Sequence, residues 1–237
     1  MRYLVVGAAG HAQEVAWSLR EQAAAQGERA DLLFFDDHLP RAQLPSGLGE
    51  IVGGLDAIAA HAQPDTTRLV LGIGLPRVKA TIVGRLSALG IPWATVIHPG
   101  ATIGPNVAIG QGSYVAAGAI LTVNVRIGRF ATINLHCQVA HDGVLEDLVT
   151  LHPDTHLSGN VTVGEGSELG TGTLVIPGVR IGRWAVLGAG CVAVRSLDGG
   201  GVYVGVPAAA LRPNPRPRAA RRAPRRRKET RVTRRAR

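Results

Sequence analysis

The chain has 237 residues, a mass of 24.7 kDa and a formal net charge of +9. This length allows one large domain or two small ones and excludes a marginal mini-protein. The positive charge is concentrated at the end of the chain, where residues 212–237 contain 13 Lys and Arg against one acidic residue, Glu229. The rest of the chain is mildly acidic, and its low aromatic content of 4% disfavours a stacking platform for single-stranded nucleic acid.

The two cysteines, Cys137 and Cys191, are too few for a disulfide framework in a chain of this length, and no C-x-x-C pair indicates a zinc or redox centre. No segment has the pattern of an export signal or of a membrane span. We therefore expect a protein of the reducing cytoplasm.

Residues 1–95 alternate between strand-like and helix-like segments. Strands are expected at 3–6, 32–35 and 69–72, and helices at 11–25, 55–62 and 78–89. This alternation, with glycine at the joints, predicts an α/β domain that contains a small Rossmann-like parallel sheet.

The joint between the first strand and the first helix contains Gly7 and Gly10, separated by two alanines and followed by His11. Glycines at such a joint allow a sharp turn and leave backbone amides free at a helix N-terminus, which is a natural place for a phosphate. The second strand ends at Asp36 and Asp37, where nucleotide-binding folds often carry the carboxylate that contacts ribose or base. The spacing is shorter than the full G-x-G-x-x-G fingerprint, so a simple packing turn is the alternative.

Residues 96–211 carry a different pattern, in which every sixth residue is Ile, Leu or Val. The series is Ile97, Ile103, Ile109, Val115, Leu121, Ile127, Ile133, Val139, Leu145, Leu151, Leu157, Val163, Leu169, Val175, Ile181 and Leu187. Four places after each of them stands a small or β-branched residue, and both cysteines fall in this second set. A six-residue period suits a triangular coil with one hexapeptide per side and 18 residues per turn. We therefore predict a parallel β-helix prism in which the cysteines are packing residues.

The chain resembles the sugar acyltransferase family of hexapeptide-repeat proteins, whose members acetylate nucleotide-linked amino sugars or sialic acids. The resemblance rests on the G-A-A-G-H joint, the strand-end Asp pair, the prism, the sequence of residues 134–142 (NLHCQVAHD) and the closing G-V-P-A. It implies a left-handed β-helix, a homotrimer and acetyl-CoA as co-substrate without a metal. It also implies that residues 1–95 bind the sugar nucleotide and residues 96–211 the coenzyme.

His141 and Asp142 are the predicted catalytic pair. They occupy the third and fourth places of their hexapeptide, which point away from the apolar column, so core packing does not explain them. The family's base is a histidine followed by an acidic residue, and a neutral imidazole beside a carboxylate can accept a proton from an attacking amine or hydroxyl. An exposed turn pair without a partner is the alternative.

The resemblance assigns two further groups of residues. The substrate group comprises Ala9, Gly10, His11, Asp36, Asp37, Gly74 and Asn134, and the coenzyme group comprises Thr150, Gly159, Thr171 and Ala189. Thr150 is a departure, because relatives often carry there a second histidine that holds the thioester, and His152 could replace it. The stretch of residues 75–77 that follows Gly74 also departs from the polar pattern usual in the family. His11 could be a simple helix-start residue, and the small prism residues could serve corner packing alone.

Three functions follow, in order of preference. The first is acetyl transfer from acetyl-CoA to the amine of a nucleotide-linked amino sugar, and the second is O-acyl transfer to sialic acid or another sugar. The third is a prism scaffold without catalysis. A zinc site built on His136, His152 and His156 is a weaker possibility. Residues 212–237, rich in Pro and Arg, are expected to be disordered and either dispensable or able to bind polyanions or anionic membranes non-specifically.

Overall fold

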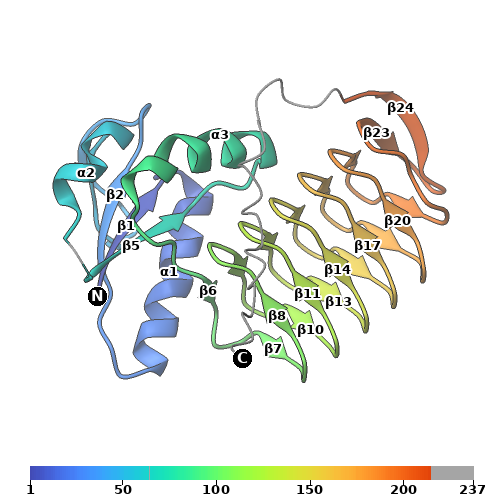
Figure 1. The fold of residues 1–237 in the computed structure, drawn as a ribbon, viewed down its shortest axis with the longest axis horizontal. Coiled ribbons are helices and arrows are strands. Elements are labelled where there is room, and N and C mark those ends of the chain that lie inside the picture. The colour runs from blue at the N-terminus through green and yellow to red at the C-terminus, as the bar shows by residue number, and fades with distance from the viewer. Residues whose placement is uncertain (64, 215–237) are drawn as a thin grey trace, which may run out of the picture.

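The computed structural model describes residues 1–63 and 65–214. An α/β domain precedes a prism of short strands, and the prism extends away from helix α3 in a regular staircase (Figure 1). In chain order the N-terminal elements are β1 (Arg2–Val6), α1 (Gly10–Ala25), β2 (Asp31–Phe35), β3 (Ala42–Gln43), β4 (Glu50–Gly53), the 3-10 turn η1 (Leu55–Ala57), α2 (Ile58–His61), β5 (Thr67–Leu71), α3 (Pro76–Leu86) and the 3-10 turn η2 (Ser87–Leu89).

The N-terminal sheet has the strand order β3-β4-β2-β1-β5, and all of its strands are parallel except β3. Successive side chains of β1 point to opposite faces, as a strand requires. Val5 packs with α1 residues such as Val15, whereas Leu4 and Val6 pack in a second cluster with Leu86 of α3. The predicted Rossmann-like layering is thus confirmed.

The predicted strands and helices of this domain are all present, with small shifts at their ends. Helix α3 begins at Pro76, two residues earlier than expected, because the fixed φ of proline suits the first helical position. The helix expected over 55–62 is a 3-10 turn that continues into the four-residue α2. Strands β3 and β4 were not predicted, because two and four residues are too few to show an alternating pattern.

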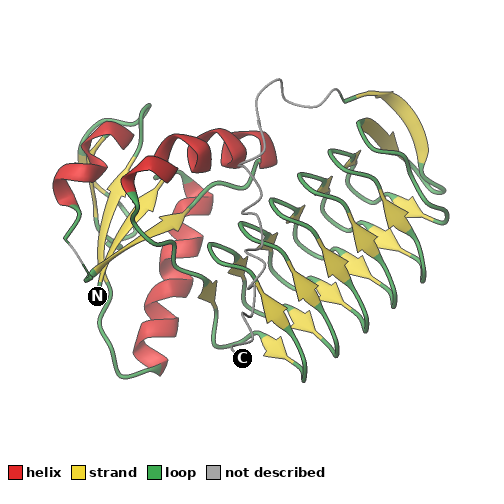
Figure 2. Cartoon of the chain, viewed as in Figure 1, coloured by secondary structure: helices red, strands yellow, loops and turns green. Residues whose placement is uncertain are grey.

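The prism has three faces of stacked parallel strands, which Figure 2 shows as rows of short arrows. Face 1 comprises β7 (Thr102–Ile103), β10 (Ile120–Leu121), β13 (Gln138–Val139), β16 (His156–Leu157), β19 (Leu174–Val175) and β22 (Val192–Ala193). Face 2 comprises β8 (Ala108–Ile109), β11 (Arg126–Ile127), β14 (Val144–Leu145), β17 (Thr162–Val163) and β20 (Arg180–Ile181). Face 3 comprises β6 (Val96–Ile97), β9 (Tyr114–Val115), β12 (Thr132–Ile133), β15 (Thr150–Leu151), β18 (Glu168–Leu169), β21 (Val186–Leu187), β23 (Gly201–Val204) and β24 (Ala209–Pro213).

Partner residues on neighbouring prism strands are 18 positions apart, as in the pairs Leu121 with Val139 and Val139 with Leu157. The aliphatic positions from Val115 to Leu187 are at most 5% exposed and form one continuous core. Ile103 is 39% exposed because its strand has a neighbour on one side only. The parallel β-helix predicted from the six-residue period is therefore confirmed, as is its left-handed form, which the family resemblance implied.

Both cysteines lie in this core, as predicted. Cys137 and Cys191 are fully buried, and burial raises the pKa of the Cys137 thiol to about 12. The Cys137 thiol lies 3.0 Å from the His152 carbonyl oxygen. At neutral pH this thiol stays protonated and acts as a small packing group.

The three edges of the prism differ in the residues that turn the corner. At each edge one residue per turn has a φ near +60°, which Asn, Asp and Gly adopt at little cost. The edge between faces 2 and 3 instead places Phe130, Leu148 and Trp184 in this conformation. These apolar side chains pack together with Leu71 of β5, and the ring of Trp93 meets that of Phe130 edge-on at 5.3 Å. Their burial against the N-terminal domain offsets a backbone cost of about 1–2 kcal/mol each.

Lys79 of α3 is completely buried at the same junction. Its Nζ donates to the Phe130 carbonyl at 2.8 Å, the Val149 carbonyl at 3.2 Å and the Thr132 hydroxyl at 3.3 Å. All three protons of the ammonium thus have acceptors on the prism. Burial lowers the pKa of Lys79 to about 7, against the weaker opposing effect of Glu168.

The hairpin of β23 and β24 covers the last turn of the prism. Strand β24 extends to Pro213, two residues beyond the expected end of ordered structure. Asn214 donates to the Trp184 carbonyl at 2.7 Å and accepts from Arg77 of α3 at 2.6 Å. The predicted disordered tail otherwise lies outside the described residues. None of the helices in the described ranges combines the length and apolarity that crossing a bilayer requires.

The buried amine of Lys79 predicts a distinct pH dependence of stability. Its pKa is near 7 in the folded protein but near 10.5 in the unfolded chain, so the unfolded state binds more protons between these values. The free energy of unfolding of the wild type, relative to Lys79→Met, should therefore increase as pH rises from 7 toward 10, by at most about 1.4 kcal/mol per pH unit. Urea denaturation of both proteins at pH 6 to 10 measures this difference. A constant difference would mean that the three hydrogen bonds keep the ammonium protonated.

Candidate active site

The glycine joint lies at the carboxyl end of the N-terminal sheet. Gly7 has a φ of +95°, and a Cβ added there would lie 2.9 Å from the Ile73 side chain. Helix α1 begins at Gly10 with no side-chain cap and no acidic residue in its first turn. Free amides and the positive end of the helix dipole make this joint suitable for an anion such as a phosphate.

This joint lies at the point where the strand order reverses. From β1 the chain moves to β2 on one side and later to β5 on the other, so the loops after β1 and β5 face each other. In open parallel sheets, ligands bind at this position. Helix α3 begins just after β5 at Pro76, so two helix N-termini lie at this end of the sheet.

His11 and Gly74 lie close together at this end of the sheet. A Cβ on Gly74 would lie 3.7 Å from the His11 ring, and the Gly74 carbonyl accepts a hydrogen bond of 2.6 Å from the Thr150 hydroxyl. The Nε2 atom of His11 is buried without a hydrogen-bond partner in the described part of the chain, while Nδ1 lies 3.5 Å from Glu14. Burial is the main cause that lowers the pKa of His11. The ring is thus neutral at pH 7 and has an unused polar atom, which is unusual for a purely structural histidine.

The two strand-end carboxylates bind groups of the protein itself. Asp36 accepts a hydrogen bond of 3.0 Å from the Ala8 amide and so braces the glycine joint. Asp37 accepts from the Leu55 amide at 2.7 Å and pairs with Arg85 at 2.6 Å, and these two contacts, in that order, lower the pKa of Asp37. Their predicted contact with substrate remains a prediction, and the geometry gives Asp36 a supporting role toward the joint.

His141 and Asp142 lie on a different edge of the molecule, between β13 of face 1 and β14 of face 2. The Nδ1 atom of His141 is 2.8 Å from Asp142 Oδ2, and the two side chains are 56% and 46% exposed. The hydrogen bond from His141, followed by one from Asn124, lowers the pKa of Asp142. An ionised carboxylate at Nδ1 fixes the tautomer in which Nε2 carries the lone pair. This is the state that a general base needs.

Gly159 lies directly below this pair, one turn further along the prism. A Cβ on Gly159 would overlap the His141 ring, so only glycine leaves the imidazole in its place. The Asn160 amide donates to the His141 carbonyl at 2.9 Å and fixes the backbone there. Of the predicted coenzyme residues, Gly159 is thus the one that the chain places beside the predicted catalytic pair.

The other predicted site residues lie elsewhere in the same chain. Thr171 and Ala189 stack on the edge between faces 3 and 1, where the Gly190 amide donates to the Thr171 carbonyl at 2.8 Å. Thr150 is buried on face 3 beneath the loop that contains Gly74. Its hydroxyl donates within the chain, so its coenzyme role remains a prediction.

Asn134, also on face 3, is 8% exposed, and its side-chain oxygen accepts from the Leu135 amide at 2.8 Å. Ala9 and Gly10 form the glycine joint together with His11. Of the predicted substrate residues, the structure thus brings together those of the joint and Gly74.

A second histidine–carboxylate pair, not predicted from the sequence, lies on face 3. His152 Nε2 is 2.8 Å from Glu168 Oε1, and both side chains are largely covered. His136 pairs loosely with Asp154 at 3.7 Å on another edge, and His156 lies on face 1. The three histidines thus occupy different sides of the prism, and within the described residues no group of three His, Cys, Asp or Glu is arranged to hold a metal ion.

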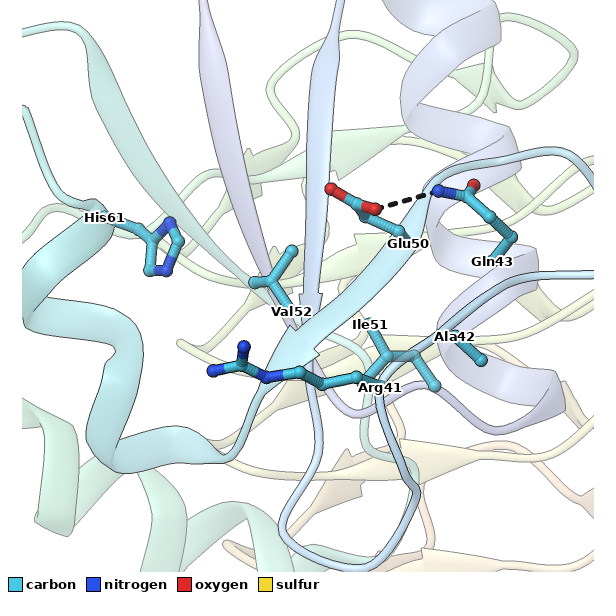
Figure 3. A pocket seen from close by; sticks show the side chains of 7 residues that line it. All are labelled: Arg41, Ala42, Gln43, Glu50, Ile51, Val52 and His61. Carbon is cyan, nitrogen blue, oxygen red and sulfur yellow. Dashed lines mark hydrogen bonds between the residues drawn. The ribbon is translucent and has the colours of Figure 1, made fainter.

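A hollow beside β3 and β4 lies away from all of these residues. Figure 3 shows it beside β3 and β4, with the Gln43 amide donating to Glu50 at 2.8 Å. It encloses about 460 Å³ and is lined by Arg41, Ala42, Gln43, Glu50, Ile51, Val52 and His61. Because it includes neither His11 nor His141, it does not mark the candidate site.

Residues 2–86 match the family described as the PglD N-terminal domain. The GDP-perosamine N-acetyltransferase of Escherichia coli O157:H7 is 25% identical over 193 residues, which cover 79% of this chain and 83% of that protein. The acetyltransferase domain of PglB from Neisseria gonorrhoeae superposes with a TM-score of 0.81 and 31% identity, covering 89% of this chain and 99% of that one. A variant of perosamine N-acetyltransferase from Caulobacter crescentus, solved with CoA and GDP-perosamine, gives a TM-score of 0.80 and 33% identity over 89% and 97% of the two chains.

The chain belongs to the hexapeptide-repeat sugar acetyltransferases. The resemblance expected from the sequence is confirmed, and with it the identity of the chain as an acyltransferase.

The contact between Gly159 and His141 can be tested by adding one methyl group. In Gly159→Ala the new Cβ displaces the imidazole, and we expect kcat to fall roughly 10- to 100-fold, because a shift of about 1 Å in a catalytic group has effects of this size. Gly84→Ala, on an open part of α3 where a Cβ meets no atom within 4 Å, is the control and should keep full activity. Steady-state kinetics with both substrates decides the matter. A change in the KM for acetyl-CoA alone would make Gly159 a wall of the coenzyme cleft and not a support for His141.

Proposed function

We propose that the protein transfers the acetyl group of acetyl-CoA to the amine of a nucleotide-linked amino sugar. The observation that carries this proposal is the presence, in one chain, of a His–Asp base at a prism edge and a phosphate-type crevice at the switch point of the sheet. Relatives with the same two-part architecture are N-acetyltransferases, and one was solved with CoA and GDP-perosamine. Their names favour transfer to nitrogen over transfer to a sugar hydroxyl.

His141 acts as the general base in this reaction. Its Nδ1 proton is donated to Asp142, so Nε2 is free to accept a proton from the attacking amine. The amine nitrogen forms a bond to the thioester carbon, and the carbonyl oxygen takes the negative charge of the tetrahedral intermediate. When the intermediate collapses, the C–S bond breaks and the proton on Nε2 passes to the thiolate of CoA. The products are an amide and the free thiol.

The active site lies between copies of the chain in this proposal. The N-terminal domain packs on the edge between faces 2 and 3, whereas His141 lies on the edge between faces 1 and 2. Within one chain, the crevice of His11 and the base are therefore on different sides of the prism. Face 1, which borders the edge of His141, exposes the apolar side chains of Leu174, Ile176 and Val194. A homotrimer that covers these side chains and places the crevice of one copy against the base of the next satisfies both observations.

The proposed base predicts the outcome of two substitutions. His141→Ala should lower kcat by roughly 10²–10⁴, the range for loss of a general base, with acetyl-CoA binding unchanged. Asp142→Asn should lower kcat less, because Asp142 orients the ring and does not receive the substrate proton. The assay measures thiol release from acetyl-CoA with a panel of UDP-, GDP- and TDP-linked amino sugars. Turnover of His141→Ala near the wild-type rate at saturating substrate would refute this role, and no turnover with any amino sugar would refute the substrate class.

The basic tail is proposed to act apart from catalysis. Residues 215–237 carry 12 Lys and Arg against one acidic residue, and such a segment attracts polyanions and anionic membranes with an affinity that falls as salt rises. Acetyl-CoA as donor fits the cytoplasmic location expected from the sequence. A tail of this kind would concentrate the enzyme at an anionic surface without entering the active site.

Truncation of the tail tests this separation. The chain should be cut after Asn214, because Asn214 binds both Trp184 and Arg77 and directly follows β24. We expect the shortened protein to remain trimeric by light scattering and to keep its kcat, while its binding to anionic vesicles and DNA at low salt is lost. Loss of activity with the trimer preserved would show that the tail contributes to the active site.

A further inference from the structure

A ladder of amide side chains leads along the prism edge to the catalytic pair. Asn106 Nδ2 donates to Asn124 Oδ1 at 2.8 Å, and Asn124 Nδ2 donates to Asp142 Oδ1 at 3.2 Å. The other oxygen of Asp142 binds His141. The three ladder residues are spaced by 18 positions and occupy the same place in successive turns.

The backbone holds the ladder in register. Asn106, Asn124 and Asp142 have φ values of 56°, 58° and 59°, so their Cα–Cβ bonds leave the edge in parallel directions. Asn160, the next residue of this series, has the same φ of 59°. Its side chain makes no hydrogen bond to another described residue. The left-handed turn therefore explains why Asn stands at these positions, but not why the amides of Asn106 and Asn124 are joined to Asp142.

The direction of the ladder is fixed by Asp142. Because an ionised carboxylate can only accept, the nitrogen of the Asn124 amide faces Asp142, and its oxygen is left to accept from Asn106. Asp142 is 46% exposed and would otherwise rotate freely in water. With one oxygen bound to Asn124 and the other to His141, the carboxylate is held in one plane. A neutral donor achieves this without adding a charge beside the base.

We propose that Asn124 is a positioning residue for the proposed reaction, which orients Asp142 and through it the imidazole of His141. The inference rests on the proposed role of His141 as base. The turns on either side of the pair contribute Val123, Asn124, Gly159 and Asn160, none of which titrates. Among the described residues, His141 is the only titratable side chain that affects the pKa of Asp142. A charge placed at position 124 should therefore change the electrostatic environment of the His141–Asp142 pair directly.

Two substitutions separate positioning from a structural role. Asn124→Asp keeps the shape and tolerates the left-handed backbone, but it replaces the donor by a second carboxylate. This should raise the pKa of His141 and move the acid limb of the kcat/KM profile to higher pH by about half a unit, since a neutral base is required. Asn124→Gly also tolerates the turn and removes both amide bonds, so kcat should fall by about 3- to 10-fold with both KM values unchanged.

Matched controls are available on the same edge. Asn160→Gly removes an amide at the same backbone position on the far side of Asp142 and should leave kcat within twofold of the wild type. Asn106→Gly should have a smaller effect than Asn124→Gly, because it acts one step further away. Thermal unfolding of each variant shows whether the turn is preserved. An effect of Asn160→Gly as large as that of Asn124→Gly would assign the loss to the turn and overturn the proposal.

NMR titration of His141 provides a readout that is independent of turnover. It is measured in the wild type, Asn124→Asp and Asp142→Asn, and His141→Gln serves to assign the signal. A shifted His141 titration in Asn124→Asp supports the ladder, whatever the activity of His141→Ala. Activity retained by His141→Ala would refute only the proposed role of His141 as base. If His141→Ala is inactive but Asn124→Asp keeps the wild-type titration and pH–rate profile and Asn124→Gly keeps the wild-type kcat, the ladder does not position the pair and the proposal is wrong.

Discussion

Each turn of the prism passes through three corners that need a left-handed backbone, and this constraint determines what each edge can carry. Asn, Asp and Gly reach the conformation at little cost, so an edge built from them is free to present polar groups. The edge between faces 1 and 2 uses Asn106, Asn124, Asp142 and Asn160 in this way. Because residues 18 positions apart stack, an amide or carboxylate at one corner is automatically next to its counterpart one turn away.

The edge between faces 2 and 3 meets the same constraint with the opposite chemistry. Phe130, Leu148 and Trp184 accept a strained backbone, and this is tolerable only where a large apolar surface covers them. The N-terminal domain supplies that surface, and Lys79 adds three hydrogen bonds to the prism. The position of the N-terminal domain relative to the prism is therefore set by the corner residues themselves. The His141–Asp142 pair lies on another edge and is about half exposed in the single chain.

The sequence predicted the parts of the fold that repeat and missed those that depend on a single contact. The six-residue period is carried by sixteen aliphatic positions, so the prism and its buried cysteines could be recognised without a structure. The spacing of Asn106, Asn124 and Asp142 was also readable, because each lies 18 positions from the next, but the direction of their hydrogen bonds depends on side-chain rotation.

Lys79 gave no signal of its burial. A lone lysine on a short helix is usually a surface residue, and its environment is created only when α3 packs on the prism. The sequence did not indicate the His152–Glu168 pair for a similar reason. Its members are 16 positions apart and meet only through the register of β15 and β18. Local patterns thus identified the elements, whereas contacts between distant segments were visible only in three dimensions.

The two carboxylates at the end of β2 stabilise the structure around the glycine joint. Asp36 braces the joint through the Ala8 amide, and Asp37 is paired with Arg85. These contacts leave lone pairs for a ligand, because an ionised carboxylate can accept about four hydrogen bonds, and the Asp37 side chain is 37% exposed. The backbone amides at the start of α1 have no side-chain cap, and the Nε2 of His11 has no partner among the described residues. Amides recognise the phosphates that all sugar nucleotides share, and they do not distinguish one base from another. Any selection among nucleotides would therefore come from side chains and not from the amides of the joint.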